Sequence, residues 1–99
     1  MTILVDEPRE YETKLRYKWW SHMVSDVGPD ELHAFAKQLG LKRSWSQERP
    51  HHYDITPPVR ERAIALGAVA VSARELVRRN YDGLTRRRER GELPTRIAP

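Results

Sequence analysis

The stretch PHHYDIT, residues 50–56, holds the densest group of side chains in the chain that could do chemistry. Its two histidines are neighbours, and neighbouring side chains on an extended chain point apart, so at most one can join Asp54 in a site. We assign that role to His52, because a histidine side chain could act there as a general acid or base. For the stretch taken alone we favour the simpler interpretation, in which Tyr53 and Asp54 bond only locally and order the approach to the next helix.

A metal site needs three or four ligands that converge on one point. Partners for the PHHYDIT stretch would have to come from Asp6, His22 or Asp26, which are distant in the sequence. Neither H-x-x-x-H nor H-E-x-x-H spacing occurs in the chain. We therefore predict no metal and no cofactor. A metal-dependent hydrolase stays open as an alternative, and it would use Asp6, His22, His52 and Asp54.

The segments that must position these residues include three with the character of strands. Residues 3–5 (ILV) and 68–71 (AVAV) are short apolar runs bounded by polar residues or glycine, which predicts two buried strands. Aromatic and branched residues over 17–24 favour a third strand. Residues 9–16 alternate in charge without an apolar face and are predicted to form a loop. Residues 41–55 are expected to form one or two extended pieces around a turn.

Three further segments are predicted to be helical. A helix over about 29–39 has apolar residues at i, i+3, i+4 and i+7, and Gly40 ends it. A second helix starts at Thr56, whose hydroxyl is expected to cap it, and stops at Gly67. A third starts at the capping box of residues 72–75, SARE.

This alternation of strands and helices predicts an α/β fold, in which a small single-domain sheet, at least partly parallel, is covered by about three helices. We expect residues 1–85 to form that single domain. Residues 86–99 are rich in arginine and contain two prolines, and they are expected to form a basic, frayed C-terminal tail.

The composition narrows the classes of protein that need consideration. The 99 residues carry a net charge of +4, with ten Arg against five Asp or Glu from Arg60 onward. The chain has no cysteine, which excludes thiol chemistry. It also has no secretory leader pattern and no apolar run near the roughly 20 residues that a membrane span needs. We therefore expect a cytoplasmic protein without membrane contact, whose oligomeric state the sequence leaves open.

Ligands of α/β sheets bind beyond the carboxyl ends of the strands. Asp6 follows the first strand, and Ser72 and Arg74 follow the AVAV strand at a helix start that could bind an anion. Our leading hypothesis is a non-enzymatic or weakly enzymatic module that binds a phosphate-bearing small ligand, such as a nucleotide, at this edge. The residues expected to hold the ligand or shape its pocket are Asp6, His22, Trp45, His52, Tyr53, Asp54, Ser72 and Arg74.

Two alternatives from other classes remain beside the hydrolase. Arg86, Arg87, Arg88 and Arg90 could contact the phosphates of a nucleic acid, in which case binding would be sensitive to salt. A host protein could instead be the partner, with an exposed tryptophan at position 19 or 20 as the anchor.

Four stretches carry a resemblance to a known family. They are WSHMVSD at 20–26, ELHAFAKQLGLKRSW at 31–45, HYD at 52–54 and RAIALGAVAVSARELV at 62–77. Together they resemble the domain of unknown function 4031 family of short phage and bacterial proteins, over most of residues 2–80. The resemblance implies almost no function. Members show W-F-Q where this chain has Trp45, Ser46 and Gln47, so the aromatic residue of that pattern is replaced here.

Overall fold

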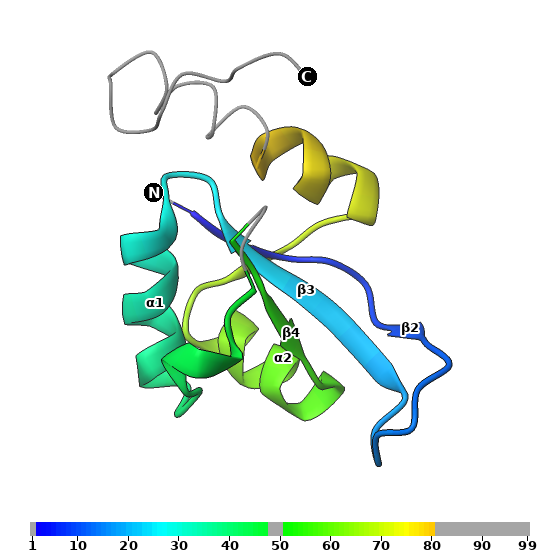
Figure 1. The fold of residues 1–99 in the computed structure, drawn as a ribbon. Coiled ribbons are helices and arrows are strands. Elements are labelled where there is room, and N and C mark those ends of the chain that lie inside the picture. Colours follow the sequence, from blue (N-terminus) through cyan, green and yellow to red (C-terminus); the bar gives the residue numbers. More distant parts are fainter. Residues whose placement is uncertain (1, 48–50, 81–99) are drawn as a thin grey trace, which may run out of the picture.

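The computed structural model describes residues 2–47 and 51–80, and it arranges them as a mixed sheet with helices (Figure 1). The five strands are β1 (Ile3–Val5), β2 (Arg9–Glu10), β3 (Trp19–Ser25), β4 (Tyr53–Ile55) and β5 (Val69–Ala70). The helices are α1 (Pro29–Gln38), the short 3-10 helix η1 (Arg43–Trp45), α2 (Pro57–Ala65) and an α-helical segment over residues 73–80.

Strand β3 is the centre of the sheet and pairs antiparallel with β1, β2 and β4, while β1 pairs parallel with β5. The sheet is therefore partly parallel, and three α-helical segments accompany it within the described residues. This confirms the predicted fold class. None of the helices in the described ranges is long and apolar enough to cross a membrane.

A β-bulge separates β1 from β2. Val5 lies opposite Met23 and Arg9 lies opposite Trp20, so four steps along β1–β2 match only three along β3. The extra residue falls in the segment 6–8, where the backbone N–H of Asp6 still donates to the carbonyl of His22 at 3.2 Å. Bulges of this kind bend a strand and re-aim a side chain, and this one places Asp6 beside the middle of β3.

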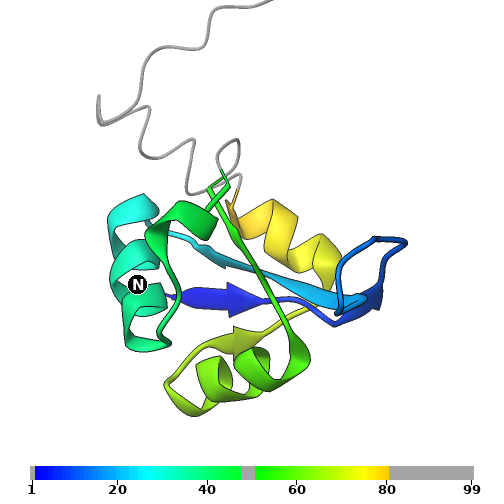
Figure 2. The same cartoon turned by 60° about the horizontal axis from the view of Figure 1, so that its bottom comes forward.

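The sheet is covered on both faces, as the turned view in Figure 2 shows. Ile3, Val5 and Met23 belong to the larger core, which also takes the buried residues of α1 and α2. The alternate residues Leu4 and Val24 face the other way and pack with Leu76 of the helix over residues 73–80 in a smaller core. This second face carries the candidate site.

Some elements differ from their predictions. The AVAV strand was predicted to be buried, but Val69 and Ala70 of β5 are exposed and only Ala68 is buried. The reason is that β5 pairs with β1 alone among the described strands and lies at the edge of the sheet. Thr56 precedes α2 as expected, yet its hydroxyl makes no capping hydrogen bond. The loop predicted over 9–16 begins with β2, because β3 offers a pairing partner.

Part of the chain falls outside the described residues. The predicted basic tail, with Arg86, Arg87, Arg88 and Arg90, lies there. So does the centre of the turn expected within residues 41–55.

Candidate functional site

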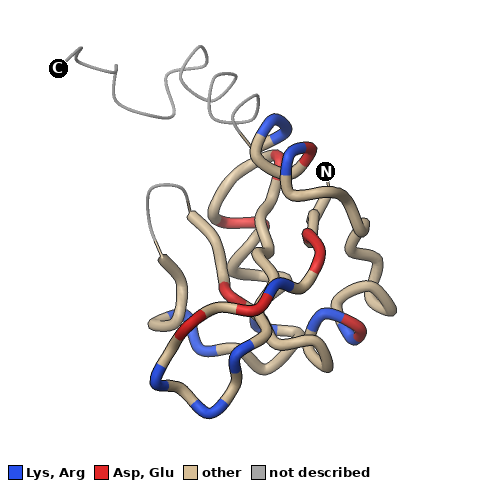
Figure 3. Tube along the Cα trace, turned by 90° about the vertical axis from the view of Figure 1, so that its right-hand side faces the viewer, with Lys and Arg blue, Asp and Glu red and all other residues tan. Residues whose placement is uncertain are grey.

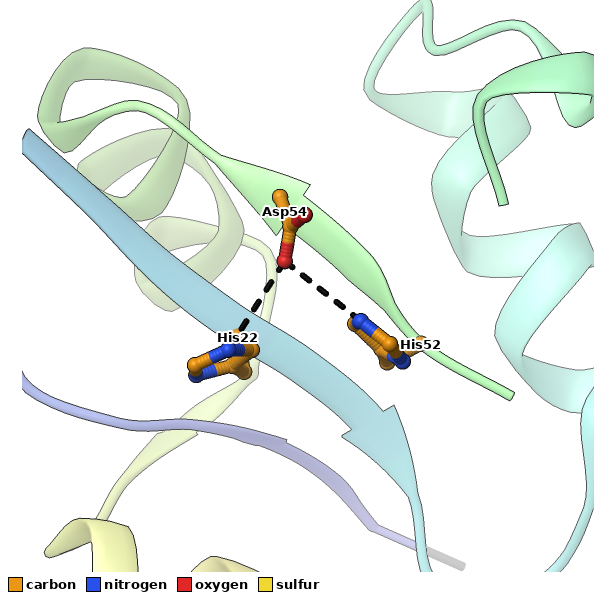
Figure 4. A group of neighbouring side chains, drawn as sticks. All are labelled: His22, His52 and Asp54. Atoms are coloured by element: carbon orange, nitrogen blue, oxygen red, sulfur yellow. Dashed lines mark ion pairs between the residues drawn. The ribbon is translucent and has the colours of Figure 1, made fainter. Parts of the chain in front are cut away.

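Four polar residues meet on the face that carries the smaller core. Asp6 comes from the bulge after β1, and His22 lies in the middle of β3. Asp54 of β4 pairs directly with His22 across the sheet, and His52 precedes β4. The three side chains of His22, His52 and Asp54 point toward one another in Figure 4. Residues from three separate parts of the sequence therefore form one cluster.

Asp6 holds His22 with both of its carboxylate oxygens. Oδ1 accepts the backbone N–H of His22 at 2.6 Å, and Oδ2 lies 2.8 Å from the ring Nδ1. Asp6 is only 3% exposed, and Arg60 of α2 donates from Nε to its carbonyl oxygen at 2.8 Å. An ionised carboxylate can only accept, so Nδ1 is the donor. The ring is thereby fixed with Nε2 on the side away from Asp6.

The charges around His22 favour its protonated form. The hydrogen bond that His22 donates to Asp6 is the main cause that raises the pKa of His22 above its usual value, and the negative charges of Asp6 and Asp54 add to it. Partial burial and the positive charge of Arg9 act in the opposite direction. The site is therefore one of negative potential, which attracts a proton or another cation.

Asp54 lies between the two histidines. Its Oδ1 is 3.8 Å from Nε2 of His22 and 3.5 Å from Nε2 of His52. Both distances are longer than those of hydrogen bonds but within the range of ion pairs, and the three ligand atoms lie within 4.8 Å of one another. The second oxygen, Oδ2, accepts from the side-chain Nε2 of Gln47 at 2.6 Å, and this contact orients the carboxylate.

Gln47 also positions His52. The two residues form an isolated antiparallel bridge, with backbone N to O distances of 2.8 and 2.9 Å. The ring of His52 lies 5.6 Å from that of His22, whereas His51 lies 6.3 Å from His33. The two neighbouring histidines therefore face different partners, and His52 is the one that lies at the cluster.

Two hollows open beside the cluster. One, of about 270 Å³, lies between the sheet and the helix over residues 73–80, and its lining includes Asp6, His22 and His52 together with Arg9 and Tyr11. The other, of about 230 Å³, is lined by Tyr11, Thr13, Leu15, Trp20, His22 and Asp54. Tyr11 and His22 belong to both linings. A ligand in either hollow would therefore contact His22.

The other predicted site residues lie elsewhere. Tyr53 is buried in the larger core, where its hydroxyl is 2.7 Å from Nδ1 of His33. Trp45 is exposed, with the ammonium of Lys42 5.7 Å from its ring centre. Ser72 accepts the backbone N–H of Glu75 at 3.1 Å and caps its helix.

Arg74 is exposed and is not among the residues that line either hollow. The structure thus brings together Asp6, His22, His52 and Asp54 from the eight predicted residues.

Three residues that contribute to the candidate site were not predicted from the sequence. Gln47 carried one signal, its place in the W-F-Q pattern, but that pattern does not say what its side chain touches. Arg9 and Tyr11 could not be found, because the segment that contains them gave no periodic pattern and its pairing depends on β3.

Fold and site together define a small α/β protein with a two-histidine, two-carboxylate cluster on one face of a mixed sheet. The family described as Protein of unknown function (DUF4031) matches residues 3–82. The chain belongs to this family, which confirms the resemblance. Neither the curated proteins nor the solved structures that were compared gave a significant match.

Proposed function

We propose that the protein binds a divalent transition metal ion through His22, His52 and Asp54 and uses it in hydrolysis. The observation that carries the proposal is that each of these side chains offers one ligand atom and that the three atoms lie within 4.8 Å of one another. This is the arrangement kept open from the sequence as a metal-dependent hydrolase, with Asp6 in a supporting position.

The distances are close to those of a formed metal site. Zinc lies about 2.0–2.1 Å from histidine nitrogen and carboxylate oxygen, so two ligand atoms of a tetrahedral site are about 3.3 Å apart. The separations of 3.5 and 3.8 Å to Asp54 exceed this by a few tenths of an ångström, and all three ligand atoms lie within 4.8 Å of one another. Closing the site around an ion would require rotations of these partly exposed side chains.

The residues that hydrogen-bond the proposed metal ligands are of the kind that orient ligands in known metal sites. A histidine that binds a metal commonly donates its other ring N–H to a carboxylate, which fixes the ring and makes the ligand more basic. Asp6 accepts such a bond from His22 at 2.8 Å. Gln47 similarly holds the oxygen of Asp54 that faces away from the histidines. The ligand atoms are therefore directed by contacts that exist without the ion.

Three protein ligands suit a catalytic site better than a structural one, because a fourth or further position stays open for water or substrate. Imidazole and carboxylate together suit zinc or ferrous iron rather than magnesium or calcium. A bound ion of this kind would lower the pKa of a coordinated water and supply a nucleophile. The adjoining hollows give a substrate access to that position.

A phosphate-bearing ligand, the leading hypothesis from the sequence, remains a proposal, but with different residues around the phosphate. Asp6, His22 and His52 line the larger hollow, and the cation that lines it is Arg9 rather than Arg74. A phosphate group would therefore be held by Arg9 and the metal. Phosphate esters are for this reason the first substrates to test.

The remaining hypotheses stay predictions. Trp19 is 50% exposed and could anchor a protein partner, whether or not that partner comes from a host cell. The cytoplasmic location and the contribution of the basic tail also stay predictions.

Isothermal titration of chelator-treated protein with Zn²⁺ tests the metal site. We expect about one equivalent to bind. His52→Ala should lose most of this binding, and His51→Ala is the matched control because it removes the neighbouring histidine, which faces His33. Co²⁺ absorption would then report the coordination geometry.

Two results would reject the proposal. One is the absence of saturable binding for Zn²⁺, Fe²⁺ and Co²⁺. The other is an equal loss of binding in His51→Ala and His52→Ala. Hydrolysis itself is tested by release of nitrophenol from bis(4-nitrophenyl) phosphate with the metal-loaded protein, where His52→Ala should abolish the release and His51→Ala should not.

A further inference from the structure

The β2–β3 hairpin, residues 9–20, concentrates exposed apolar side chains. Within the described residues eight large apolar side chains are exposed, and four of them, Tyr11, Leu15, Tyr17 and Trp19, lie on this hairpin. The hairpin extends from the body of the domain at the β2 end of the sheet (Figure 1). Exposed aromatic rings grouped in this way are typical of surfaces that bind a partner.

The tip of the same hairpin carries positive charge that forms no ion pair within the described residues, whereas Glu10 and Glu12 lie at its β2 side. Its tip, residues 13–18, contains Lys14, Arg16 and Lys18 and no acidic residue. Basic residues follow one another around this tip in Figure 3. None of the ion pairs found in the described part of the chain involves these three cations. The guanidinium of Arg16 lies 5.6 Å from the ring centre of Tyr17, so cation and ring present one surface.

The hairpin is continuous with the candidate metal site. The hollow of about 230 Å³ is lined by Thr13 and Leu15 of the hairpin together with His22 and Asp54. Trp20 lies in the same lining and donates from its ring nitrogen to the carbonyl of Tyr17 at 3.0 Å. A chain-like ligand on the hairpin would therefore reach the metal ligands without crossing a covered surface.

We propose that the β2–β3 hairpin binds single-stranded nucleic acid and directs one of its phosphodiesters to the cluster of His22, His52 and Asp54. Cations interleaved with exposed rings match a ligand in which phosphates alternate with bases, since unpaired bases stack on aromatic faces and phosphates pair with Lys and Arg. An acidic peptide would pair with the cations but would cover the rings only where its own sequence supplies apolar side chains, whereas every nucleotide supplies both a phosphate and a base. The surface therefore favours the polynucleotide.

The delivery of the phosphodiester rests on the proposed metal-dependent hydrolysis, whereas binding at the hairpin does not. In that reaction the oxygen of water bonds to phosphorus, and one phosphorus–oxygen ester bond breaks. The products are a phosphomonoester and an alcohol, whose hydroxyl proton comes from the water. No oxidant, reductant or further reactant is consumed.

Fluorescence anisotropy with a fluorescein-labelled oligothymidylate of about 20 nucleotides tests the binding step. The titration is done with the full chain in the presence of a chelator, so that no metal is needed. Replacing Lys14, Arg16 and Lys18 together by Ala should weaken binding about tenfold or more and reduce the slope of log affinity against log salt by about 2. Lys14→Ala with Arg16→Ala is a milder variant that keeps the bond of Lys18 to the carbonyl of Thr13.

Two controls match this change. Replacing Arg86, Arg87 and Arg88 by Ala removes the same number of positive charges from the tail and should reduce binding less than the hairpin variant. Tyr17→Leu and Trp19→Leu should weaken binding without changing the salt slope, while Trp45→Leu removes an exposed ring on η1 and should have no effect.

Several outcomes would overturn the proposal. One is that the oligonucleotide does not bind at low salt. Another is that the tail variant loses as much binding as the hairpin variant, or more. The third is that polyglutamate competes as well as unlabelled oligonucleotide while Tyr17→Leu and Trp19→Leu leave binding unchanged. Zinc titration of the hairpin variant separates this proposal from the preceding one. Intact metal binding with no oligonucleotide binding rejects only the hairpin, and the reverse result rejects only the metal site.

Discussion

The side chain of Asp6 bonds His22 twice, because its two carboxylate oxygens accept from the backbone N–H and from the ring Nδ1 of that residue. The double contact is made where the bulge brings Asp6 beside β3. A single residue therefore fixes both the main chain and the ring orientation of His22.

The first prediction concerns Asp6→Asn. The amide keeps the size of the side chain but removes the charge and the strong acceptor that raise the pKa of His22. We expect the pKa of His22 to fall, as followed by NMR titration of its ring protons in the presence of a chelator. Zinc affinity should fall about 10- to 100-fold, the usual effect of losing a carboxylate behind a ligating histidine. Glu12→Gln, which removes an exposed negative charge, should change neither value.

The second prediction concerns the pH dependence of stability. The pKa of His22 is raised in the folded state above 6.5, the usual value for histidine. The stability that its protonated form contributes is therefore present in full below pH 6.5 and is lost as the pH rises through the raised pKa. His33 has a lowered pKa, mainly because of burial, so its neutral form is favoured and stability is lost as the pH falls below 6.5.

Urea unfolding at pH 5.5 and pH 8.5 checks these signs. His22→Gln should destabilise the protein more at the lower pH. His33→Gln should destabilise the protein less at pH 5.5 than at pH 8.5. The reason is that the folded state disfavours protonation of His33, and this cost at low pH disappears with the histidine. Equal effects at the two pH values would contradict the assigned environments.

The third prediction concerns Gln47→Ala. This change removes the side-chain donor to Asp54 and keeps the backbone bridge to His52. Zinc affinity should fall, but less than in Asp54→Ala, because the ligand remains and only its orientation is loosened. Calorimetric titration measures both, with Gln38→Ala at the exposed end of α1 as the control. An unchanged affinity in Gln47→Ala would show that Asp54 needs no support.

The fourth prediction concerns Tyr53→Phe, which deletes the hydroxyl that contacts His33 on the face opposite the cluster. The free energy of unfolding should fall by about 1 kcal/mol, the typical net value of a hydrogen bond inside a protein. Zinc affinity should not change. Urea unfolding and zinc titration of the same preparation check both statements, and a loss of metal binding would place Tyr53 in the site after all.

The sequence predicted the element types well where local signals decide them. The apolar spacing of α1 and the glycine that follows it, at φ 79°, agree with the structure. The burial of AVAV was wrong because an apolar run does not tell whether its strand lies inside a sheet or at its edge. The bulge could not be predicted, since it is a difference in register between β1 and β2 along β3.

For the candidate site too, local signals were predictable from the sequence and contacts between distant segments were not. Chemical type was enough to single out Asp6, His22, His52 and Asp54, and strand alternation separated His52 from His51. Their meeting depends on the pairing of β3 with β4, which is a contact between distant segments. Arg74 was selected because its segment follows a strand, but the start of a helix fixes the place of a residue and not the direction of a long side chain.

The parallel pairing of β1 with β5 joins the first strand of the described chain to the last. Every residue of the cluster precedes α2 in the sequence, so all four are synthesised before the helix over residues 73–80 that packs on the same face. The backbone N–H of Val71 donates to the carbonyl of Val5 on the way to that helix. The cover of the cluster therefore depends on the last described part of the chain, whereas the cluster's own side chains all come from the part before α2.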